Sequence, residues 1–168
     1  MMQRLFIMVL VLSTVSVVSV AQLDVYNGKN PIVISQGGVK HIYVSGDIGL
    51  VLRQETGDGV NVRMDKDLSD KVKVTVHGEK LYITSKATLP NNEKLVVFGW
   101  FNNLESLTIK GNSMVASIGV LDYQRLTVNM DDQARVSLRT TGKILMHAPQ
   151  NANLIQYEQY HSVTSGTR

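Results

Sequence analysis

The sequence contains no cysteine, and this absence excludes several kinds of site and scaffold at once. A disulfide framework, a thiolate zinc site, a cysteine nucleophile and a lipid anchor on a lipoprotein cysteine are all ruled out. Many small exported domains depend on disulfides for stability, whereas this chain must depend on apolar burial and backbone pairing. A regular, sheet-rich core meets that requirement better than a small loop-rich scaffold.

A concentrated run of charge of one sign is also missing. The formal net charge is +3, from 17 Lys and Arg against 14 Asp and Glu, and the cations are spread along the chain. The sequence therefore carries no electrostatic footprint of nucleic-acid binding and no polybasic membrane-binding segment. We expect no nucleic-acid partner and no stable membrane insertion once a signal peptide has been removed.

The N-terminus has the pattern of such a signal peptide. Arg4 precedes the apolar run "LFIMVLVL", and the small residues Ser19 and Ala21 fit a cleavage site after Ala21. An uncleaved anchor is the alternative, because the apolar stretch is nearly long enough to span a bilayer. We predict a signal peptide at 1–21, an N-terminal cap segment at 22–38, one domain at 39–160 and a flexible tail at 161–168. The protein is then periplasmic, on the outer envelope or extracellular.

Helical periodicity is almost absent from the rest of the chain. Apolar residues recur at every second position, as in Ile42 and Val44 or Val72, Val74 and Val76, and Gly, Asn and Asp bound these runs. Such runs are typical of strands with one buried face. The stretch "VHGEKLYI" predicts a tight turn at 77–80, where Gly78 can adopt a positive φ.

Three stretches have the same form, namely "LTIKGNSMVASIGV", "LTVNMDDQARVSL" and "ILMHAPQNANLIQ". An offset of 18 aligns Leu126, Val128 and Met130 with residues 144, 146 and 148, and aligns 134, 136 and 138 with 152, 154 and 156. In the N-terminal direction, the same offset aligns residues 134, 136 and 138 with Ala116, Ile118 and Val120. Leu107 matches Leu126 at an offset of 19, and the pair 42 and 44 falls on 60 and 62 at 18. A fixed period of this length predicts a β-solenoid.

Two other arrangements can produce a similar period. An antiparallel β-sandwich has strands every 8–12 residues or so, and this gives a spacing near 20 for two strands and two turns. It stays open as the alternative fold. A left-handed β-helix of hexapeptides needs apolar residues at every sixth position, but counting from Leu107 these positions hold Ser113, Gly119 and Arg125. That variant is excluded.

Most of the chain from Val39 resembles a family of exported bacterial proteins, the putative auto-transporter adhesins with a head GIN domain. The resemblance rests on "IYVSGDIGLVLRQ", on "VNVRMDKDLSDKVKVTVHGEKLYI" and on the later repeats "LTIKGNSMVASI" and "LTVNMDDQARVSL". It implies an all-β fold, a single-stranded right-handed β-helix with coils of about 18–20 residues. It implies no catalytic residue and no cofactor. After the last of these repeats, the chain has room for only about one more coil.

The sequence offers no catalytic or metal-binding constellation. The four histidines are scattered, and none has a second His at ligand spacing. The acidic loop at 65–70 lacks the Gly and Glu of a calcium loop, because these positions hold Asp70 and Val76. Asp131 and Asp132 are expected to serve a turn, where Asp can bond its own backbone. We predict no cofactor, no metal and no catalytic residue.

Aromatic residues are few, and they cluster in two places. Trp100 and Phe101 precede Asn102 and Asn103, and Tyr157 and Tyr160 lie near the C-terminus. Aromatic rings beside amides suit a sugar or a protein hot spot, so these six residues are the candidate ligand-binding residues. Gly99 is expected to let the indole project outward. The alternative is that the phenylalanines cap the core and Trp100 fills a groove.

The predicted function is a non-catalytic, exported cell-envelope domain that acts by binding, adhesion or scaffolding. A carbohydrate-active enzyme, either a lyase or a hydrolase, is one alternative, and a purely structural spacer is another. A glycan or an envelope or surface protein is the expected partner, and a homodimer through an open sheet end is a further possibility.

Overall fold

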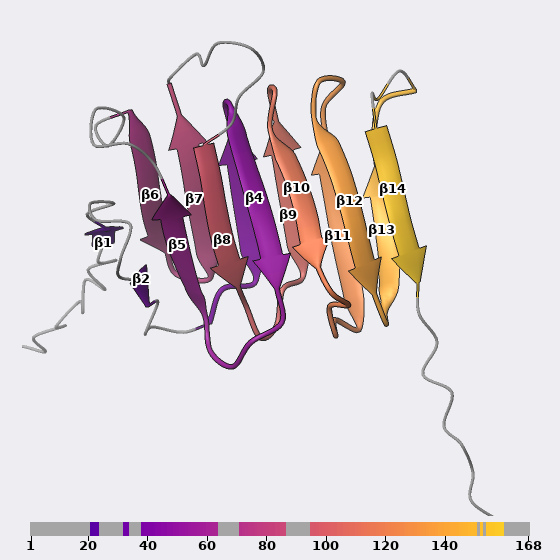
Figure 1. The fold of residues 1–168 in the computed structure, drawn as a ribbon, viewed down its shortest axis with the longest axis horizontal. Helices are drawn as coiled ribbons and strands as arrows, with labels where there is room; N and C mark the ends of the chain where they lie inside the picture. The colour runs from indigo at the N-terminus through magenta and orange to yellow at the C-terminus, as the bar shows by residue number, and fades with distance from the viewer. Residues whose placement is uncertain are drawn as a thin grey trace, which may run out of the picture.

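The computed structural model describes residues 21–23, 32–33, 38–63, 71–86, 95–150, 152 and 154–159. These residues form fourteen strands, and no helix occurs among them (Figure 1). The all-β class is therefore confirmed. Consequently, no helix long and apolar enough to cross a bilayer is found in the described ranges. Residues 1–20, most of the predicted cap segment and the predicted tail lie outside the described residues.

The strands form two sheets of seven strands each, which lie one behind the other in Figure 1. In spatial order, sheet A contains β1 (Ala21–Leu23), β6 (Val72–His77), β7 (Lys80–Ser85), β3 (His41–Ser45), β9 (Ser106–Lys110), β11 (Arg125–Met130) and β13 (Lys143–His147). Sheet B contains β14 (Leu154–Gln159), β12 (Arg135–Thr140), β10 (Met114–Ile118), β4 (Ile48–Arg53), β8 (Leu95–Trp100), β5 (Gly59–Arg63) and β2 (Ile32–Val33).

Both sheets are mixed. Five strands of each run parallel, namely β7, β3, β9, β11 and β13 in sheet A and β8, β4, β10, β12 and β14 in sheet B. The remaining strands, β1, β6, β5 and β2, pair antiparallel at one end of the molecule. The alternative fold, a purely antiparallel sandwich, is therefore wrong.

The spatial order of the strands differs from their order in the chain. β3 is flanked by β7 and β9 in sheet A, and β4 is flanked by β8 and β10 in sheet B, so later strands are added on both sides of β3 and of β4. A simple β-helix adds each coil to the one before it. The antiparallel strands β5 and β6 interrupt that succession here. A right-handed β-helix with coils of 18–20 residues is therefore not confirmed.

The hydrophobic core lies between the two sheets. In β3, Ile42 and Val44 are buried and their neighbours are partly exposed, and β4 buries Ile48, Leu50 and Leu52 from the facing sheet. This alternation follows from the geometry of a strand, in which successive side chains point to opposite faces. The apolar period of two in the sequence therefore sets which face of each strand is buried.

The predicted register is correct between β11 and β13. Leu126 pairs with Ile144 and Val128 with Met146, an offset of 18. Leu107, however, pairs with Val128 rather than Leu126, so the offset there is 21 rather than 19. The offsets of 19 and 21 differ by two residues, so both leave the same side chains in the core. The apolar pattern alone therefore cannot distinguish them, and the length of the connecting segment decides.

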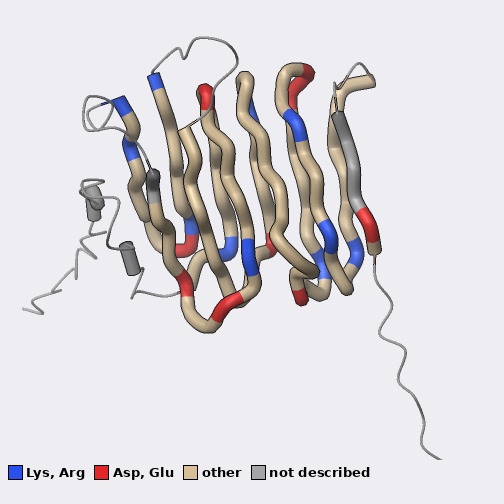
Figure 2. Tube along the Cα trace, viewed as in Figure 1, with Lys and Arg blue, Asp and Glu red and all other residues tan. Residues whose placement is uncertain are grey.

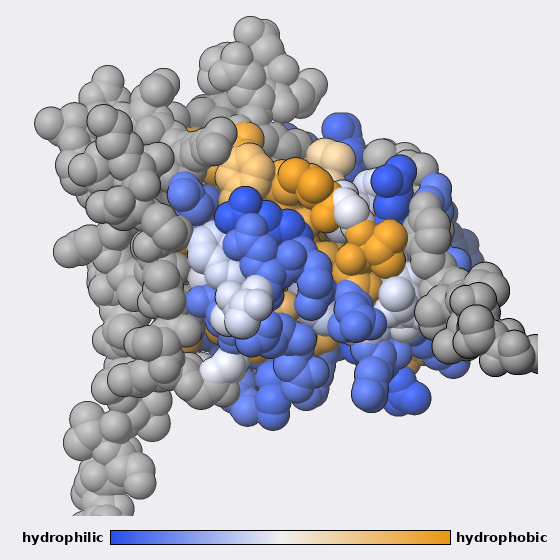
Figure 3. Space-filling model, turned by 60° about the horizontal axis from the view of Figure 1, so that its bottom comes forward, coloured by the Kyte–Doolittle hydropathy of each residue, from blue (hydrophilic) through white to orange (hydrophobic). Residues whose placement is uncertain are grey.

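The offset of 18 is wrong for β10. Ala116 pairs with Ser137, and the buried residue of this strand is Val115. Ile118 and Val120, which the repeat placed in the core, are 60% and 37% exposed. A register change of an odd number of residues turns a strand over and exposes the other set of side chains. Figure 3, in which the bottom of the molecule comes forward, shows hydrophobic areas among the hydrophilic ones on this side of the surface.

Two further expectations concern the N-terminal half. The alignment of 42 and 44 with 60 and 62 is wrong, because β3 belongs to sheet A and β5 to sheet B. The tight turn at 77–80 is confirmed. There His77 pairs with Lys80 between antiparallel β6 and β7, and Gly78 has a φ of 57°.

Polar side chains connect neighbouring turns at one end of the sheets. Asp131 accepts hydrogen bonds from the backbone of Gln133 and Ala134 in its own turn and, at 2.7 Å, from that of Gly111 in the preceding one. Ser113 donates to the carbonyl of Gly46 at 2.8 Å. The predicted turn role of Asp131 is therefore confirmed, and these bonds help to fix the spacing of the strands.

Candidate functional site

The predicted aromatic site around Trp100 is part of the packed structure. Trp100 ends β8 and is only 8% exposed, and the guanidinium of Arg53 lies 5.0 Å from its ring centroid. Phe101 is fully buried. Gly99 makes room for that ring, because a Cβ at Gly99 would lie 2.7 Å from a ring atom of Phe101. Gly99 thus serves the packing of Phe101, and the indole of Trp100 is covered rather than exposed to solvent as expected.

Both asparagines that follow are exposed, and Asn102 takes part in hydrogen bonds to neighbouring segments. Asn102 accepts a hydrogen bond from the Gly57 backbone through its side chain at 3.1 Å, and its own backbone N–H donates to Asp58 at 2.8 Å. Asp58 is buried and also accepts from the backbone N–H of Val39 at 2.5 Å. Asn103 is exposed. The Asn102 amide therefore joins two loops.

The second predicted cluster lies far from the first. Tyr157 belongs to β14, and three strands, β12, β10 and β4, separate it from β8 in sheet B. At about 4.8 Å per strand, this distance is about 19 Å. Tyr160 lies outside the described residues. The six predicted ligand-binding residues therefore do not form one site, and a role in binding stays a prediction.

Tyr123 completes the packing next to this loop, and its titration offers a test of the packing. Its hydroxyl donates to the Phe101 carbonyl at 2.9 Å, and burial, with a smaller contribution from the negative charge of Asp58, raises the pKa of Tyr123 well above its ordinary value. Above about pH 10 the unfolded chain therefore loses this proton before the folded chain does. Stability from this group is fully present below that pH and falls as the pH rises.

We expect Tyr123→Phe to cost about 1 kcal/mol at neutral pH, because it leaves the Phe101 carbonyl without its donor. The difference in unfolding free energy between the two proteins should shrink as the pH rises from about 9 to 11. Denaturant titrations at several pH values measure it, and the tyrosines common to both proteins cancel. Parallel pH profiles would contradict the burial of this phenol.

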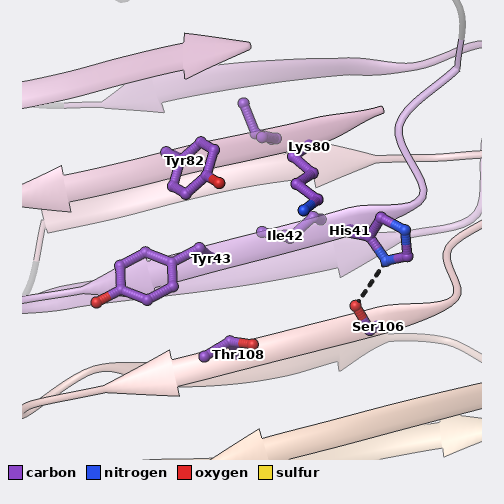
Figure 4. Close-up of a pocket in the computed structure, with 8 residues that line it drawn as sticks. His41, Ile42, Tyr43, Lys80, Tyr82, Ser106 and Thr108 are labelled. Atoms are coloured by element: carbon purple, nitrogen blue, oxygen red, sulfur yellow. Dashed lines mark hydrogen bonds between the residues drawn. The ribbon is translucent and has the colours of Figure 1, made fainter. Parts of the chain in front are cut away.

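A different site lies on the outer face of sheet A. A groove of about 310 Å³ crosses the three adjacent strands β7, β3 and β9, and we call it the outer-face groove (Figure 4). Its volume is near the lower limit of small-molecule sites, about 300–1,000 Å³. Most of its lining residues are outward-facing strand residues, and two are the buried residues between them. The lining consists of His41, Ile42, Tyr43, Lys80, Leu81, Tyr82, Ser106 and Thr108.

The strand register arranges these side chains in two rows. Lys80, His41 and Ser106 are direct neighbours across the three strands and form the first row. Tyr82, Tyr43 and Thr108 form the second row, two residues further along each strand. Figure 4 shows the charged and imidazole groups at one end of the groove and the two phenol rings at the other.

The two tyrosines form an open aromatic pair. The ring centroids of Tyr43 and Tyr82 lie 5.8 Å apart, and the ring planes are tilted by 43°. His77 contacts Tyr82 edge-on at 5.7 Å, and the ammonium of Lys110 lies 6.0 Å from the centroid of the Tyr43 ring. Both tyrosines are partly exposed. A ligand can therefore reach the rings, while neighbouring side chains hold them in place.

Hydrogen-bonding groups lie beside the rings. The Nδ1 atom of His41 is 2.8 Å from the Ser106 hydroxyl, and this contact orients the imidazole. At the nearby strand ends, Lys40 pairs with Glu79 at 2.7 Å and approaches Glu105 at 4.0 Å. The hydrogen bond and charge of Glu79 raise the pKa of Lys40. The two carboxylates closest in sequence to the groove strands are thus engaged by a cation.

The groove lacks the groups of a metal centre. Among the described residues, no cluster of three His, Asp or Glu could hold a metal ion. The sequence analysis did not identify this groove, because its residues are separated by up to 67 positions, from His41 to Thr108, and each looks like an ordinary outward strand residue. The outward pattern Tyr-x-Ser of β3 and Tyr-x-Thr of β7 is the only local signal.

Comparison with known proteins places the chain in a family. The model of the family described as putative auto-transporter adhesin, head GIN domain, matches residues 39–155, and the chain belongs to that family. This confirms the resemblance noted in the sequence, and the adhesin description points to an exported or surface protein. A search among curated proteins found no match.

Solved structures share the fold. A putative adhesin from Parabacteroides merdae is 18% identical with a TM-score of 0.60, and the match covers 80% of this chain and 55% of that one. A putative lipid binding protein from Parabacteroides distasonis is 18% identical with a TM-score of 0.56, over 77% of this chain and 59% of that one. The chain thus spans less than two thirds of these relatives.

Proposed function

We propose that this chain is a non-catalytic, exported domain of the cell envelope that binds a saccharide in the outer-face groove. The tilted pair Tyr43 and Tyr82 beside the His41–Ser106 contact is the observation that carries the proposal. A tyrosine ring offers an apolar face to the C–H groups of a sugar, and its hydroxyl offers a hydrogen bond at the sugar's edge. Hydroxyl and imidazole groups beside such rings can bond the remaining sugar hydroxyls.

The scaffold supports binding at low entropic cost. All lining residues of the groove belong to three paired strands, and the alternate residues of these strands are fixed in the core. A site on regular strands is held more firmly than a site on loops, so less conformational freedom is lost when a ligand binds.

The composition of the groove favours binding over hydrolysis. Glycoside hydrolysis generally needs two carboxyl groups that flank the scissile bond. The seven strands of sheet A contain no Asp or Glu. A lyase that uses a tyrosine or histidine as its base is the rival function, so the binding experiment includes a turnover measurement.

We also propose that the strands from β9 onward are coils of a short right-handed β-helix. The chain alternates there between the two sheets, and each strand pairs in parallel with the corresponding strand of the next coil at offsets of 18, 19 or 21 residues. A left-handed connection in an experimental structure would refute this.

The binding proposal predicts a specific loss when the aromatic rings are removed. Tyr43→Thr and Tyr82→Thr delete the rings but keep residues that favour strands. We expect each to weaken binding of the oligosaccharides selected on a glycan array by about tenfold or more, because aromatic anchors dominate such sites. Calorimetric titration of the chain from Gln22 measures the affinity, and release of reducing or unsaturated ends measures turnover.

Leu145→Thr is the matched control. Leu145 lies on the outer face of β13, which is separated from β3 by two strands, so its removal leaves the groove unchanged. Binding that survives both tyrosine substitutions would refute the groove as the site. Turnover that depends on Tyr43 or His41 would replace the binding function with a lyase.

A further inference from the structure

We infer that the ligand of the outer-face groove is an acidic glycan, one that carries carboxylate or sulfate groups. This inference rests on the proposed function and adds the charge of the ligand to it. It derives from the distribution of ionisable residues over the two sheets rather than from the groove alone.

Sheet A carries positive charge only. Its seven strands contain five Lys or Arg residues, three His residues and no Asp or Glu, and in spatial order these are Lys73, His77, Lys80, His41, Lys110, Arg125, Lys143 and His147. The five Lys and Arg side chains are all exposed. Since they lie on alternate positions with buried neighbours, they project from the outer face.

The acidic residues lie elsewhere. Figure 2 shows them mainly in the turns at the strand ends. Glu79 and Glu105, which border the strands of the groove, both face Lys40. On sheet B two of the cations have acidic partners, since Arg53 pairs with Glu55 at 3.0 Å and Arg139 with Glu158 at 3.5 Å. Among the described residues, the salt bridges include none of the five outer-face cations of sheet A.

Two of these lysines flank the aromatic pair. Lys80 lies in the first row, next to His41, while Lys110 pairs with Ser45, four residues further along β3. Four residues of a strand span about 13 Å. A ligand seated on Tyr43 and Tyr82 therefore meets two ammonium groups, that of Lys80 in the first row and that of Lys110, which lies 6.0 Å from the centroid of the Tyr43 ring. An oligosaccharide with repeated acidic groups matches this spacing better than a neutral sugar does.

Acidic glycans and nucleic acids are both anionic polymers with rings that stack on tyrosine. The predicted export of the chain and the serine, threonine and imidazole groups in the two rows of the groove favour a glycan, because hydroxyl-rich rings can use each of them. Single-stranded DNA therefore enters the experiment as a competitor.

The experiment compares matched ligands on the chain from Gln22. The probes are hexagalacturonate with its fully methyl-esterified counterpart, and a dextran sulfate oligosaccharide with unmodified dextran of equal length. We expect calorimetry to give at least tenfold tighter binding for the acidic member of one or both pairs, and the advantage should shrink as salt increases. Equal affinity for the neutral member of both pairs, or absence of binding to both acidic probes, would overturn the inference.

The double variant Lys80→Met and Lys110→Met removes the two charges and retains most of each apolar stem. We expect about tenfold weaker binding of the acidic probe and little change for its neutral counterpart. Arg135→Met with Arg139→Met is the control, because it makes the same change in net charge on sheet B. An equal loss in both double variants would show that only overall charge matters and would refute the site.

The two levels of the proposal fail in different ways. Suppose that neutral sugars bind as tightly as acidic ones and that Tyr43→Thr weakens this binding. The groove would then remain a saccharide site, and only its preference for acidic ligands would be refuted. Acidic probes that bind without dependence on either tyrosine would refute the groove itself. DNA that displaces the acidic probe at a lower concentration than the glycan itself would refute the glycan as ligand.

Discussion

Replacing Val128 with aspartate is expected to abolish folding or to lower the unfolding free energy by several kcal/mol. Val128 is fully buried in β11, and its direct neighbours are Leu107 on β9 and Met146 on β13. An aspartate there would lie between apolar side chains without a partner for its charge, and burial of an unpaired carboxylate is among the most destabilising single changes. Denaturant titration followed by the fluorescence of Trp100, the only tryptophan, measures the loss.

Thr127→Asp is the matched control, because the same charge is added one residue earlier. Thr127 is partly exposed on the outer face of sheet A, next to Ser106 and Leu145. We expect a cost of about 1 kcal/mol or less, since surface substitutions seldom cost more and the face is positively charged. Similar losses in the two variants would contradict the inward position of Val128 and the register of β11.

The position of Val128 illustrates what can be inferred from the sequence. Strand alternation has a period of two residues, so the buried face of β3, β4, β11 and β12 can be read directly from the apolar pattern. The offset of 18 between Leu126 and Ile144 was also correct. Both features depend on local sequence and on short connections, and these determine the geometry of neighbouring strands.

The order of strands in space could not be inferred in the same way. The placement of β7 and β9 on opposite sides of β3 depends on contacts between segments that are far apart in the chain. Ile118 shows a related difficulty, because a hydrophobic residue in the expected alternation is nevertheless 60% exposed. An apolar pattern indicates which residues can be buried. The register then decides which of the two faces of a strand is buried.

The candidate site shows the same limit more strongly. Trp100 attracted attention because it is the single tryptophan, yet it is packed beneath Arg53, while the tyrosines of the outer-face groove come together only through strand pairing. Besides the Tyr-x-Ser and Tyr-x-Thr patterns, a second, non-local signal was present in the sequence. The runs that became sheet A contain cations and no acids, and a charge count for each strand rather than for each stretch of chain would have found it.

The second large effect is expected at Asp58, which joins three segments of the chain. Its two carboxylate oxygens accept hydrogen bonds from the backbone N–H groups of Val39, at 2.5 Å, and of Asn102, at 2.8 Å. Asp58→Ala would leave both donors without a partner in a site where the aspartate is only 8% exposed. At about 1–3 kcal/mol for each of the two unsatisfied buried groups, we expect a loss of about 2–6 kcal/mol in unfolding free energy.

Two further variants separate this role from a general effect of charge. Asp58→Asn keeps the shape but turns one acceptor into a donor that faces an N–H group, so it should recover at most one of the two bonds. Asp122→Ala is the control, because Asp122 is exposed and accepts from the Thr141 hydroxyl at 2.7 Å, and its loss should cost about 1 kcal/mol or less. Hydrogen exchange at the amides of Val39 and Asn102 should accelerate in Asp58→Ala and stay slow in Asp122→Ala. Unchanged exchange at both amides, or an Asp58→Asn variant as stable as the original protein, would show that the carboxylate does not hold these segments together.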